Sequence, residues 1–268
     1  MHKQKKYLLV KRILDITFAV MVIAVSWPLM LVTAFLIKLD TPGQALFKHS
    51  RVGINHRNGV RTKNNGVGRR KGGEPGPASL NRVERRKHKD SDRRKENVAG
   101  RLFTLYKFRT MYADARERFP ELYDYRYSDE QLYSLPMKVL LAEPGSNGKG
   151  KYKRLGDDPR LTPMGMWLRR TSLDELPNLI NVITGDMSLV GPRPDIPDNI
   201  CNYKLIHMEK FNVKPGVTGL AQVMGRGLLS FHRTNELDVE YVKNCSLWLD
   251  IKIIFKTVLV ALKGEGAY

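Results

Sequence analysis

The sequence has 268 residues, 42% of them hydrophobic, and a formal net charge of +19 at pH 7. This length allows one or two domains with a buried core, and the charge indicates an anionic partner: nucleic acid, a lipid headgroup surface or a phosphorylated small molecule. Cys201 and Cys245 are the only cysteines and stand far apart without a His/Cys cluster, which excludes a disulfide framework and a zinc site.

The first element is an apolar run from Ile13 to Ile37 that carries no charge from Ile16 onward. As a helix it could cross about 30 Å of hydrocarbon, and no small-residue cleavage site follows it, as a signal peptide would require. Basic residues flank the run on both sides, at Lys3, Lys5, Lys6, Lys11 and Arg12 before it and at Lys38, Lys48 and Arg51 after it.

Under the positive-inside rule both ends of this run belong in the cytoplasm. A re-entrant helix that bends at Pro28 would satisfy that condition, with Ser26 hydrogen-bonded to a carbonyl group that the proline frees. A simple transmembrane anchor is the alternative, and both interpretations are open on these residues alone.

The second feature is a basic segment, residues 55–101. Between His56 and Arg101 it has fifteen Lys and Arg residues against five Asp and Glu residues. With almost no apolar periodicity it is predicted to be a disordered insert. Beside a membrane the segment would bind anionic lipid. Nucleic-acid binding is possible, but the segment lacks interleaved aromatic residues and any known nucleic-acid-binding module.

Short helical and extended patterns follow the insert and predict a helix-rich α+β fold. The predicted elements are a strand at 103–111, a charged helical stretch at 113–135 that breaks at Pro120, a helix at 162–170 with Pro163 in its first turn, and a helix at 174–186 that Gly185 ends.

The helix predicted at 174–186 opens with two adjacent carboxylates, Asp174 and Glu175. Ser172 and Glu175 have the spacing of a capping box, and Asp174 in the first turn would favour the helix dipole. Helix capping therefore explains the motif by itself. Adjacent helical residues point about 100° apart, so the two carboxylates must have different roles if both are functional.

The cations around this pair favour a second interpretation. Arginine forks are preferred binders of phosphate oxygens, and carboxylates among them indicate a metal–diphosphate site, because Mg²⁺ takes one or two carboxylates plus substrate phosphates. A carboxylate can also attack phosphorus. The candidate cations are Lys107, Arg109, Arg169, Arg170, Arg193 in "GPRP", Lys214 and Arg226.

The last predicted element is an amphipathic helix within "CSLWLDIKIIFKTVLVALK". Its apolar residues stand at helical spacing, with lysines between them, at Ile251, Ile254, Phe255, Val258 and Leu262. Such a helix either packs on a soluble core or lies in the membrane interface, and the apolar N-terminal run favours the interface.

Taken in order, several stretches resemble the bacterial sugar transferases, the monotopic phosphoglycosyl transferases that start glycoconjugate assembly on a polyprenyl phosphate carrier. They cover most of the chain outside the basic insert: "KRILDITFAV", "LFKHSRVG", "FTLYKFRTM", "LRRTSLDELPNLINVITGDMSLVGPRP", "KPGVTGLAQV" and "ELDVEYVKNCSLWLDIKIIFKTV".

The resemblance implies transfer of a phosphosugar from a UDP-sugar to undecaprenyl phosphate, with release of UMP and use of Mg²⁺. It implies that Asp174 is the nucleophile, forms a covalent phosphosugar–aspartate intermediate and binds the metal, with Glu175 as its acidic partner. By the same resemblance Arg169 and Arg193 hold phosphate, Arg226 and Asp238 line the site, and Lys107 belongs to it.

Three departures from the family pattern stand out. Trp27 separates Ser26 from Pro28, where the family has Ser directly before Pro. Met224 to Gly227 replaces the usual Asn-Gly-Arg-Asn, which weakens any inference on sugar specificity. The basic insert replaces a short turn.

The expected architecture is a re-entrant N-terminal membrane helix at 1–40 and a cytoplasmic catalytic domain at 41–268, interrupted by the insert at 55–101 and bearing interfacial amphipathic helices. The expected location is the bacterial cytoplasmic (inner) membrane, where the reaction would be the first membrane step of polysaccharide synthesis.

Expected partners are UDP-sugar, undecaprenyl phosphate and anionic membrane lipids, with no nucleic acid. Whether the chain forms a homo-oligomer stays open. The rival hypothesis is a membrane-tethered nucleic-acid-binding or scaffolding protein that acts through the insert.

Overall fold

The computed structural model describes residues 2–55, 100–123, 127–137 and 158–263, so most of the predicted insert lies outside the described residues. The helices, with η for 3-10 turns, are α1 (His2–Asp40), α3 (Ala115–Arg118), η2 (Pro120–Tyr123), α4 (Asp129–Ser134), α6 (Pro163–Thr171), η4 (Leu173–Glu175), α7 (Asn178–Thr184), η5 (Pro197–Asn202), η6 (Leu205–Asn212), α8 (Leu220–Met224), η7 (Arg226–Leu228), α9 (Phe231–Asn244) and α10 (Leu247–Lys263). The strands are β1 (Leu46–Val52), β2 (Leu102–Phe108), β3 (Ser188–Val190) and β4 (Gly216–Thr218). The prediction of a helix-rich α+β fold is confirmed.

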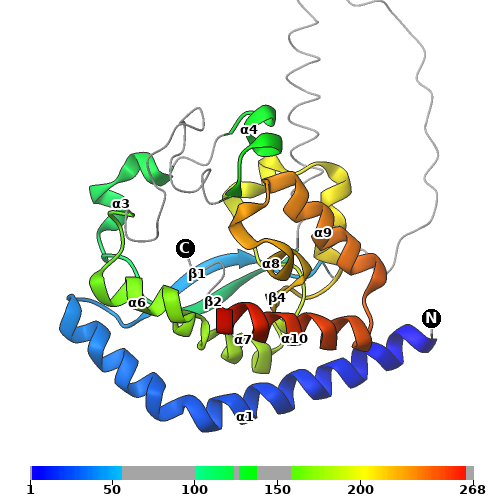
Figure 1. The fold of residues 1–268 in the computed structure, drawn as a ribbon, viewed down its shortest axis with the longest axis horizontal. Coiled ribbons are helices and arrows are strands. Elements are labelled where there is room, and N and C mark those ends of the chain that lie inside the picture. The colour runs from blue at the N-terminus through cyan, green and yellow to red at the C-terminus, as the bar shows by residue number, and fades with distance from the viewer. Residues whose placement is uncertain (1, 56–99, 124–126, 138–157, 264–268) are drawn as a thin grey trace, which may run out of the picture.

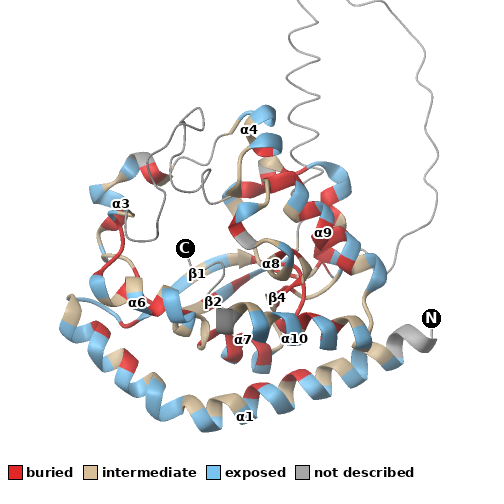
Figure 2. Cartoon of the chain, viewed as in Figure 1, coloured by how far each residue is buried: buried red, intermediate tan, exposed pale blue. Residues whose placement is uncertain are grey.

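Helix α1 is a single bent helix that runs along one side of the molecule, next to α7 and α10 (Figure 1). Residues 6–40 have a mean hydropathy of 2.4 in their most apolar window, and only 11% of that window is buried. Within the described residues it is the one helix long and apolar enough to cross a membrane. Its outward side is exposed along most of its length (Figure 2). One long apolar N-terminal helix is therefore present, as predicted, and the geometry does not show whether it re-enters a membrane or spans it.

The predicted role of Ser26 is wrong. Helix α1 continues through Pro28, and the Ser26 hydroxyl is buried without a partner among the described residues. A helical serine reaches carbonyl groups three or four residues earlier. The carbonyl freed by Pro28 belongs to Ala24, only two residues before Ser26, so the hydroxyl is out of register with it.

Two small sheets build the centre of the domain. Strands β1 and β2 pair antiparallel, with Leu46 opposite Phe108 and Val52 opposite Leu102. Strands β3 and β4 pair parallel. Beyond β3 the pairing continues into the "GPRP" loop, because Gly191 N donates to Thr218 O at 2.9 Å and Gly216 N donates to Pro192 O at 2.8 Å.

Gly191 and Gly216 are needed where the β3 and β4 chains meet. A Cβ on Gly216 would lie 2.1 Å from Gly191 N, and one on Gly191 would lie 2.4 Å from Lys214 O. No side chain fits there. This close approach fixes the start of the loop that carries Arg193.

The main core joins α1 to both sheets. It contains Ala19 of α1, Phe103 and Leu105 of β2, Leu179 and Val182 of α7, Leu189 and Val190 of β3, Tyr241 of α9 and Ile253 of α10. Asn181 of α7 is fully buried and bonds to the edge of β2, accepting from Tyr106 N at 3.1 Å and donating to Thr104 O at 2.7 Å. Helix α7 is thereby fixed on the strand that carries Lys107.

Arg109 closes the C-terminal end of α1 and is not a free cation. Its guanidinium donates to Pro42 O at 2.5 Å and to Thr41 O at 2.7 Å, and the residue is 7% exposed. These carbonyl groups belong to the two residues that follow α1, so Arg109 fixes the chain where it leaves the helix. The structure does not support Arg109 as a phosphate-binding cation, because both of its terminal nitrogens bond within the fold.

Helix α10 is amphipathic as predicted, but much of its apolar surface faces outward. Ile253 is 1% exposed and packs on the core, whereas Ile251, Phe255 and Val258 are 55%, 64% and 51% exposed. The residues recognised by helical spacing are therefore mainly those of the exposed face.

Candidate active site

The two carboxylates lie in a turn between two helices rather than at the start of one. Helix α6 ends at Ser172, and Asp174 and Glu175 belong to the 3-10 turn η4, two residues before α7 begins. Ser172 has φ 57 and ψ 17 and makes no side-chain cap bond. The predicted capping box is therefore wrong, because in the left-handed region Ser172 serves as the C-cap of α6, donating its N–H to Arg169 O at 3.3 Å.

Ser172 is the one non-glycine residue with positive φ in the described part of the chain. For an L-residue this conformation costs about 1–2 kcal/mol. Such strain is often found next to functional groups. Here it makes the sharp reversal that turns the carboxylate pair away from the axis of α6.

Asp174 is 8% exposed. Its Oδ2 lies 3.9 Å from Lys107 Nζ. Burial is the largest influence and raises the pKa of Asp174, an effect that Lys107 opposes and the Glu175 charge reinforces. A buried carboxylate close to a lysine is poorly hydrated, as a nucleophile needs to be.

Glu175 has the closer cationic contacts. Lys107 Nζ donates to its Oε1 at 2.6 Å, and Arg193 Nη1 lies 3.8 Å from the same atom. The two carboxylates thus have different environments, as the geometry of adjacent residues requires. Lys107 bridges them, and Glu175 reaches the "GPRP" loop.

Arg169 stands behind Asp174, in the last turn of α6. Its Nε donates to Thr110 Oγ1 at 3.2 Å, which directs the guanidinium along the end of β2. Burial lowers the pKa of Arg169, and the nearby Asp174 charge opposes that shift.

An open pocket with about 270 Å³ of empty space adjoins these groups. Its lining includes Lys107, Glu175 and Arg193 from the predicted site and three further polar residues, Arg51, Asn178 and Gln222. Asn178 Oδ1 and Gln222 Oε1 are buried without a partner among the described residues. Gln222 Nε2 donates to Val217 O at 3.2 Å, which fixes its oxygen as the free acceptor.

Sequence reasoning missed these three pocket residues as site residues. Arg51 was read only as a flanking charge, although it stands in the quoted stretch "LFKHSRVG". Asn178 and Gln222 are neutral residues within quoted stretches. An amide side chain does not indicate a binding site from the sequence until the groups around it in the fold are known.

Of the other predicted site residues whose side chains the structure describes, Asp174, Arg169 and Asp238 are not among those that line the pocket. Asp238 is 1% exposed and forms an ion pair with buried Lys210 at 2.8 Å. Arg226 opens η7, and its side chain lies outside the described part of the structure. Lys214 stands at the far end of α7, where its Nζ approaches Gly185.

The donor set fits a hard divalent cation. The described residues contain no group of three or more His, Cys, Asp or Glu side chains placed to hold a metal ion. Mg²⁺ needs only one or two protein carboxylates when substrate phosphates supply further oxygens. Asp174 and Glu175 offer those carboxylates, and the unpartnered Asn178 oxygen is a hard ligand nearby.

Comparison with known proteins now identifies the family. The sequence profile described as "Bacterial sugar transferase" matches residues 6–65 and 82–264. The chain belongs to the bacterial sugar transferase family. The match includes α1 and every described residue of the candidate site.

Named relatives of this family are similar over much of the chain. Galactosyl transferase CpsE of Streptococcus agalactiae is 40% identical over 74% of this chain and 37% of its own length. Undecaprenyl-phosphate galactose phosphotransferase of Salmonella typhimurium is 34% identical over 96% of this chain and 41% of its own length. This chain therefore spans about two fifths of these relatives.

A shorter relative matches more fully. UDP-glucose:undecaprenyl-phosphate glucose-1-phosphate transferase of Caulobacter vibrioides is 33% identical over 96% of this chain and 72% of its own length.

Proposed function

We propose that this chain transfers a sugar phosphate from a UDP-sugar to undecaprenyl phosphate at the cytoplasmic face of the bacterial inner membrane, releasing UMP. As the first membrane step, this reaction would begin polysaccharide or glycoconjugate synthesis. The observation that carries the proposal is the buried Asp174 beside Lys107 and Glu175, next to a pocket that Lys107, Glu175 and Arg193 line and whose cations suit a diphosphate.

In the proposed first step, an Asp174 carboxylate oxygen attacks the phosphorus that bears the sugar. A new P–O bond forms, and the bond to the UMP phosphate breaks with its electron pair leaving on UMP. In the second step an oxygen of undecaprenyl phosphate attacks the same phosphorus, and the Asp174 carboxylate leaves. Two successive displacements need no moment at which both substrates share the site.

The surrounding residues position the substrates and stabilise charge, which is most of what phosphoryl transfer requires. Lys107 draws negative charge toward the carboxylate pair at 2.6 Å from Glu175. Arg193, with a side chain 54% exposed, is accessible to a phosphate oxygen from the pocket side. Glu175 holds both cations in place.

We assign the divalent cation, Mg²⁺, to Asp174 with help from Glu175 and the Asn178 oxygen. When bound, it would neutralise the diphosphate charge and so let an anionic carboxylate approach phosphorus. Arg169, Arg226 and Asp238 stay predicted contributors: Arg169 by its proximity to Asp174, the other two by family resemblance alone.

Membrane association follows from α1 and α10. We propose that α1 re-enters the cytoplasmic leaflet and that α10 lies in the interface. The exposed apolar residues of α10, with Lys252 stacked over the Trp248 ring at 5.1 Å, suit the boundary between lipid tails and headgroups. The lipid-linked acceptor would then reach the pocket from the bilayer, and the UDP-sugar from the cytoplasm.

The direct test is UMP release by the purified chain with Mg²⁺, undecaprenyl phosphate and a panel of UDP-sugars. We expect UMP from at least one UDP-sugar, dependent on both Mg²⁺ and the acceptor for multiple turnovers. Strong salt-dependent binding to DNA or RNA without any UMP release would instead support the nucleic-acid hypothesis.

A further inference from the structure

The N-terminal part of α1 makes polar contacts that the apolar character of the helix does not predict. Arg12 Nη1 donates to Val182 O at 2.5 Å and its Nη2 donates to Ile183 O at 2.9 Å. These carbonyl groups lie in the last turn of α7, where carbonyl groups lack the usual intrahelical partner; Val182 O accepts in addition from Gly185 N at 3.2 Å. A guanidinium there also favours the negative end of the helix dipole.

The geometry of α7 is adapted to this contact. The helix ends at Gly185, whose φ of 93 is the left-handed conformation that glycine adopts freely. A Cβ on Gly185 would lie 3.2 Å from Arg12 Nη2. The absence of a side chain at Gly185 therefore leaves room for the arginine to reach the carbonyl groups.

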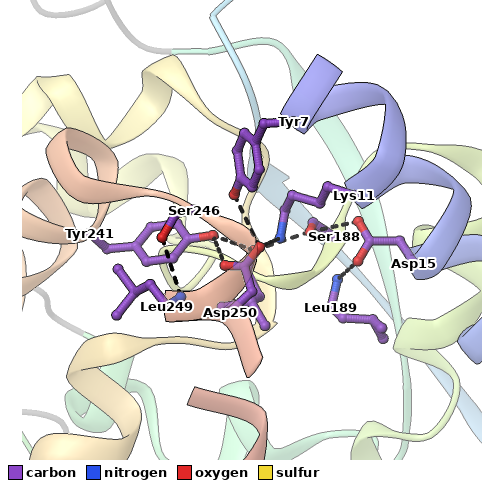
Figure 3. Close-up of polar contacts among 10 residues, drawn as sticks. Tyr7, Lys11, Asp15, Ser188, Leu189, Tyr241, Ser246, Leu249 and Asp250 are labelled. Carbon is purple, nitrogen blue, oxygen red and sulfur yellow. Dashed lines mark hydrogen bonds and ion pairs between the residues drawn. The ribbon is translucent and has the colours of Figure 1, made fainter. Parts of the chain in front are cut away.

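Asp15 holds the neighbouring strand from the same face of α1. It is 5% exposed, and it accepts from Ser188 Oγ at 2.7 Å and from Leu189 N at 3.1 Å (Figure 3). Arg12 and Asp15 are three positions apart, so their side chains project from one side of the helix. One turn of α1 thus contacts both the end of α7 and the start of β3.

A second cluster fixes this turn of α1 from the other side. Asp250 of α10 accepts from Tyr7 Oη at 3.0 Å and from Lys11 Nζ at 2.7 Å (Figure 3). The Tyr241 hydroxyl lies 2.7 Å from Asp250 Oδ1 and 3.1 Å from Val190 O. Strand β3 is therefore held by Asp15 at its beginning and by Tyr241 at its end.

Both elements that α1 contacts through Arg12 and Asp15, α7 and β3, adjoin segments of the candidate site in the chain. Helix α7 follows Asp174 and Glu175 after two residues, and β3 leads through Gly191 and Pro192 to Arg193. Within the described residues, the 3.8 Å approach of Arg193 to Glu175 joins the two segments at the pocket. Their relative placement is set at the opposite ends, by Arg12 and Asp15.

We propose that Arg12 and Asp15 are positioning residues for the transferase site, acting through α7 and β3. This inference rests on the proposed function for its kinetic consequence, but not for its structural one. A displacement of about 1 Å in a positioned catalytic group can cost about 10²-fold in rate. The membrane helix would then be part of the catalytic architecture as well as an anchor.

The test uses the full chain in lipid vesicles, with Arg12→Ala, Asp15→Asn and the conservative Arg12→Lys. Lys6→Ala is the matched control, since it removes one cation from the same end of α1 and its side chain is exposed. For Arg12→Ala we expect kcat for UMP release to fall by about 10²-fold, with KM for the UDP-sugar changed by less than about 3-fold. Arg12→Lys should recover part of kcat, because a lysine can bond one of the two carbonyl groups.

Hydrogen–deuterium exchange separates this inference from the proposed reaction. Arg12→Ala should speed amide exchange in residues 178–193 relative to Lys6→Ala, whether or not any UDP-sugar is turned over. Absence of UMP release by the unmodified chain, with faster exchange in the variant, would reject the reaction and keep the coupling. Unchanged exchange and a kcat within about 2-fold of the control would overturn the positioning role.

Discussion

At the residue scale, the site is defined by how one lysine is shared between two unlike carboxylates. Lys107 contacts Glu175 at 2.6 Å and stands 3.9 Å from Asp174. Burial raises the pKa of Asp174, and Lys107 is the largest influence acting against that shift. The lysine therefore favours the ionised form of the proposed nucleophile, and Glu175 keeps the lysine in place.

Replacing Lys107 with methionine tests this relation through the pH dependence of the reaction. The folded-state pKa of Asp174 should rise further when the cation is lost, so the ionised form is reached only at higher pH. We expect the acidic limb of the kcat/KM profile to move toward higher pH, and the plateau to fall by about 10²-fold. Lys243→Met, on the surface of α9, is the control; an unmoved acidic limb would contradict the assignment.

Ser172 tests the strained reversal before the carboxylates. A β-branched residue is disfavoured at positive φ, whereas glycine adopts it freely. Ser172→Val should therefore lower the free energy of unfolding by about 1–2 kcal/mol, and Ser172→Gly should leave it within about 1 kcal/mol. Denaturant titration of both variants measures this; equal stability would show that the conformation carries no strain.

Particular residues show what the sequence can predict here and what it cannot. Local signals worked: Pro163 and Thr162 open α6, and Gly185 ends α7. The structure brings Lys107 and Arg193 close to Glu175, as the grouping of cations with the carboxylate pair predicted, and their roles in binding stay predictions. Capping at Ser172 failed because the spacing of a capping box does not reveal the backbone conformation of its first residue.

Long-range contacts were beyond the sequence for a physical reason. In the sequence, Arg109 and Lys214 are as good candidates for phosphate binding as Lys107. In the fold, Arg109 bonds to carbonyl groups just after α1, and Lys214 stands at the end of α7. Which acceptor an arginine reaches depends on elements far away in the chain. In the sequence, Arg12 and Asp15 are charged residues at the start of an apolar run. Their contacts with α7 and β3 exist only in the folded chain.

At the element scale, α10 packs on the core of the domain with one side and exposes apolar residues on the other. Its buried side carries Asp250 and Ile253, and its exposed side carries Trp248, Ile251 and Phe255. About 25 cal/mol is gained for each Å² of apolar surface removed from water. Lipid contact would supply that gain for the outward residues.

Fluorescence of Trp248 tests the interfacial position of α10. In a variant in which the other two tryptophans, Trp27 and Trp167, are phenylalanine, lipids brominated near the headgroup end of the acyl chains should quench Trp248 strongly. Tyr133→Trp in a background without native tryptophans is the control, since α4 lies on the opposite side of the domain from α10 (Figure 1). Equal quenching at both positions, or none at Trp248, would contradict the interfacial placement.

At the scale of the whole molecule, the basic insert is separable from the site. Its ends meet on the β1–β2 hairpin, where Gly53 N donates to Arg101 O at 2.9 Å and Arg101 N donates to Ile54 O at 3.2 Å. Removing residues 56–99 would join Asn55 to Gly100. A short hairpin loop with glycine is a favoured connection between antiparallel strands.

We expect the deletion variant to fold and to keep at least part of its UMP release, because the pocket residues come from β1, β2 and the segments after residue 170. Thermal unfolding and the release assay measure both properties. A variant that folds but releases no UMP would show that the insert takes part in the reaction. Loss of nucleic-acid binding on deletion, in a chain that releases no UMP with or without the insert, would favour the rival hypothesis.

The central claim is that Asp174 carries the reaction, and Asp174→Asn tests it most directly. Asparagine keeps the size of the side chain and removes the negatively charged oxygen that would attack phosphorus. With Mg²⁺, undecaprenyl phosphate and the preferred UDP-sugar, we predict no UMP release above background from a variant that unfolds at the same temperature as the unmodified chain within a few degrees. Release of UMP at the normal rate by Asp174→Asn would contradict the claim.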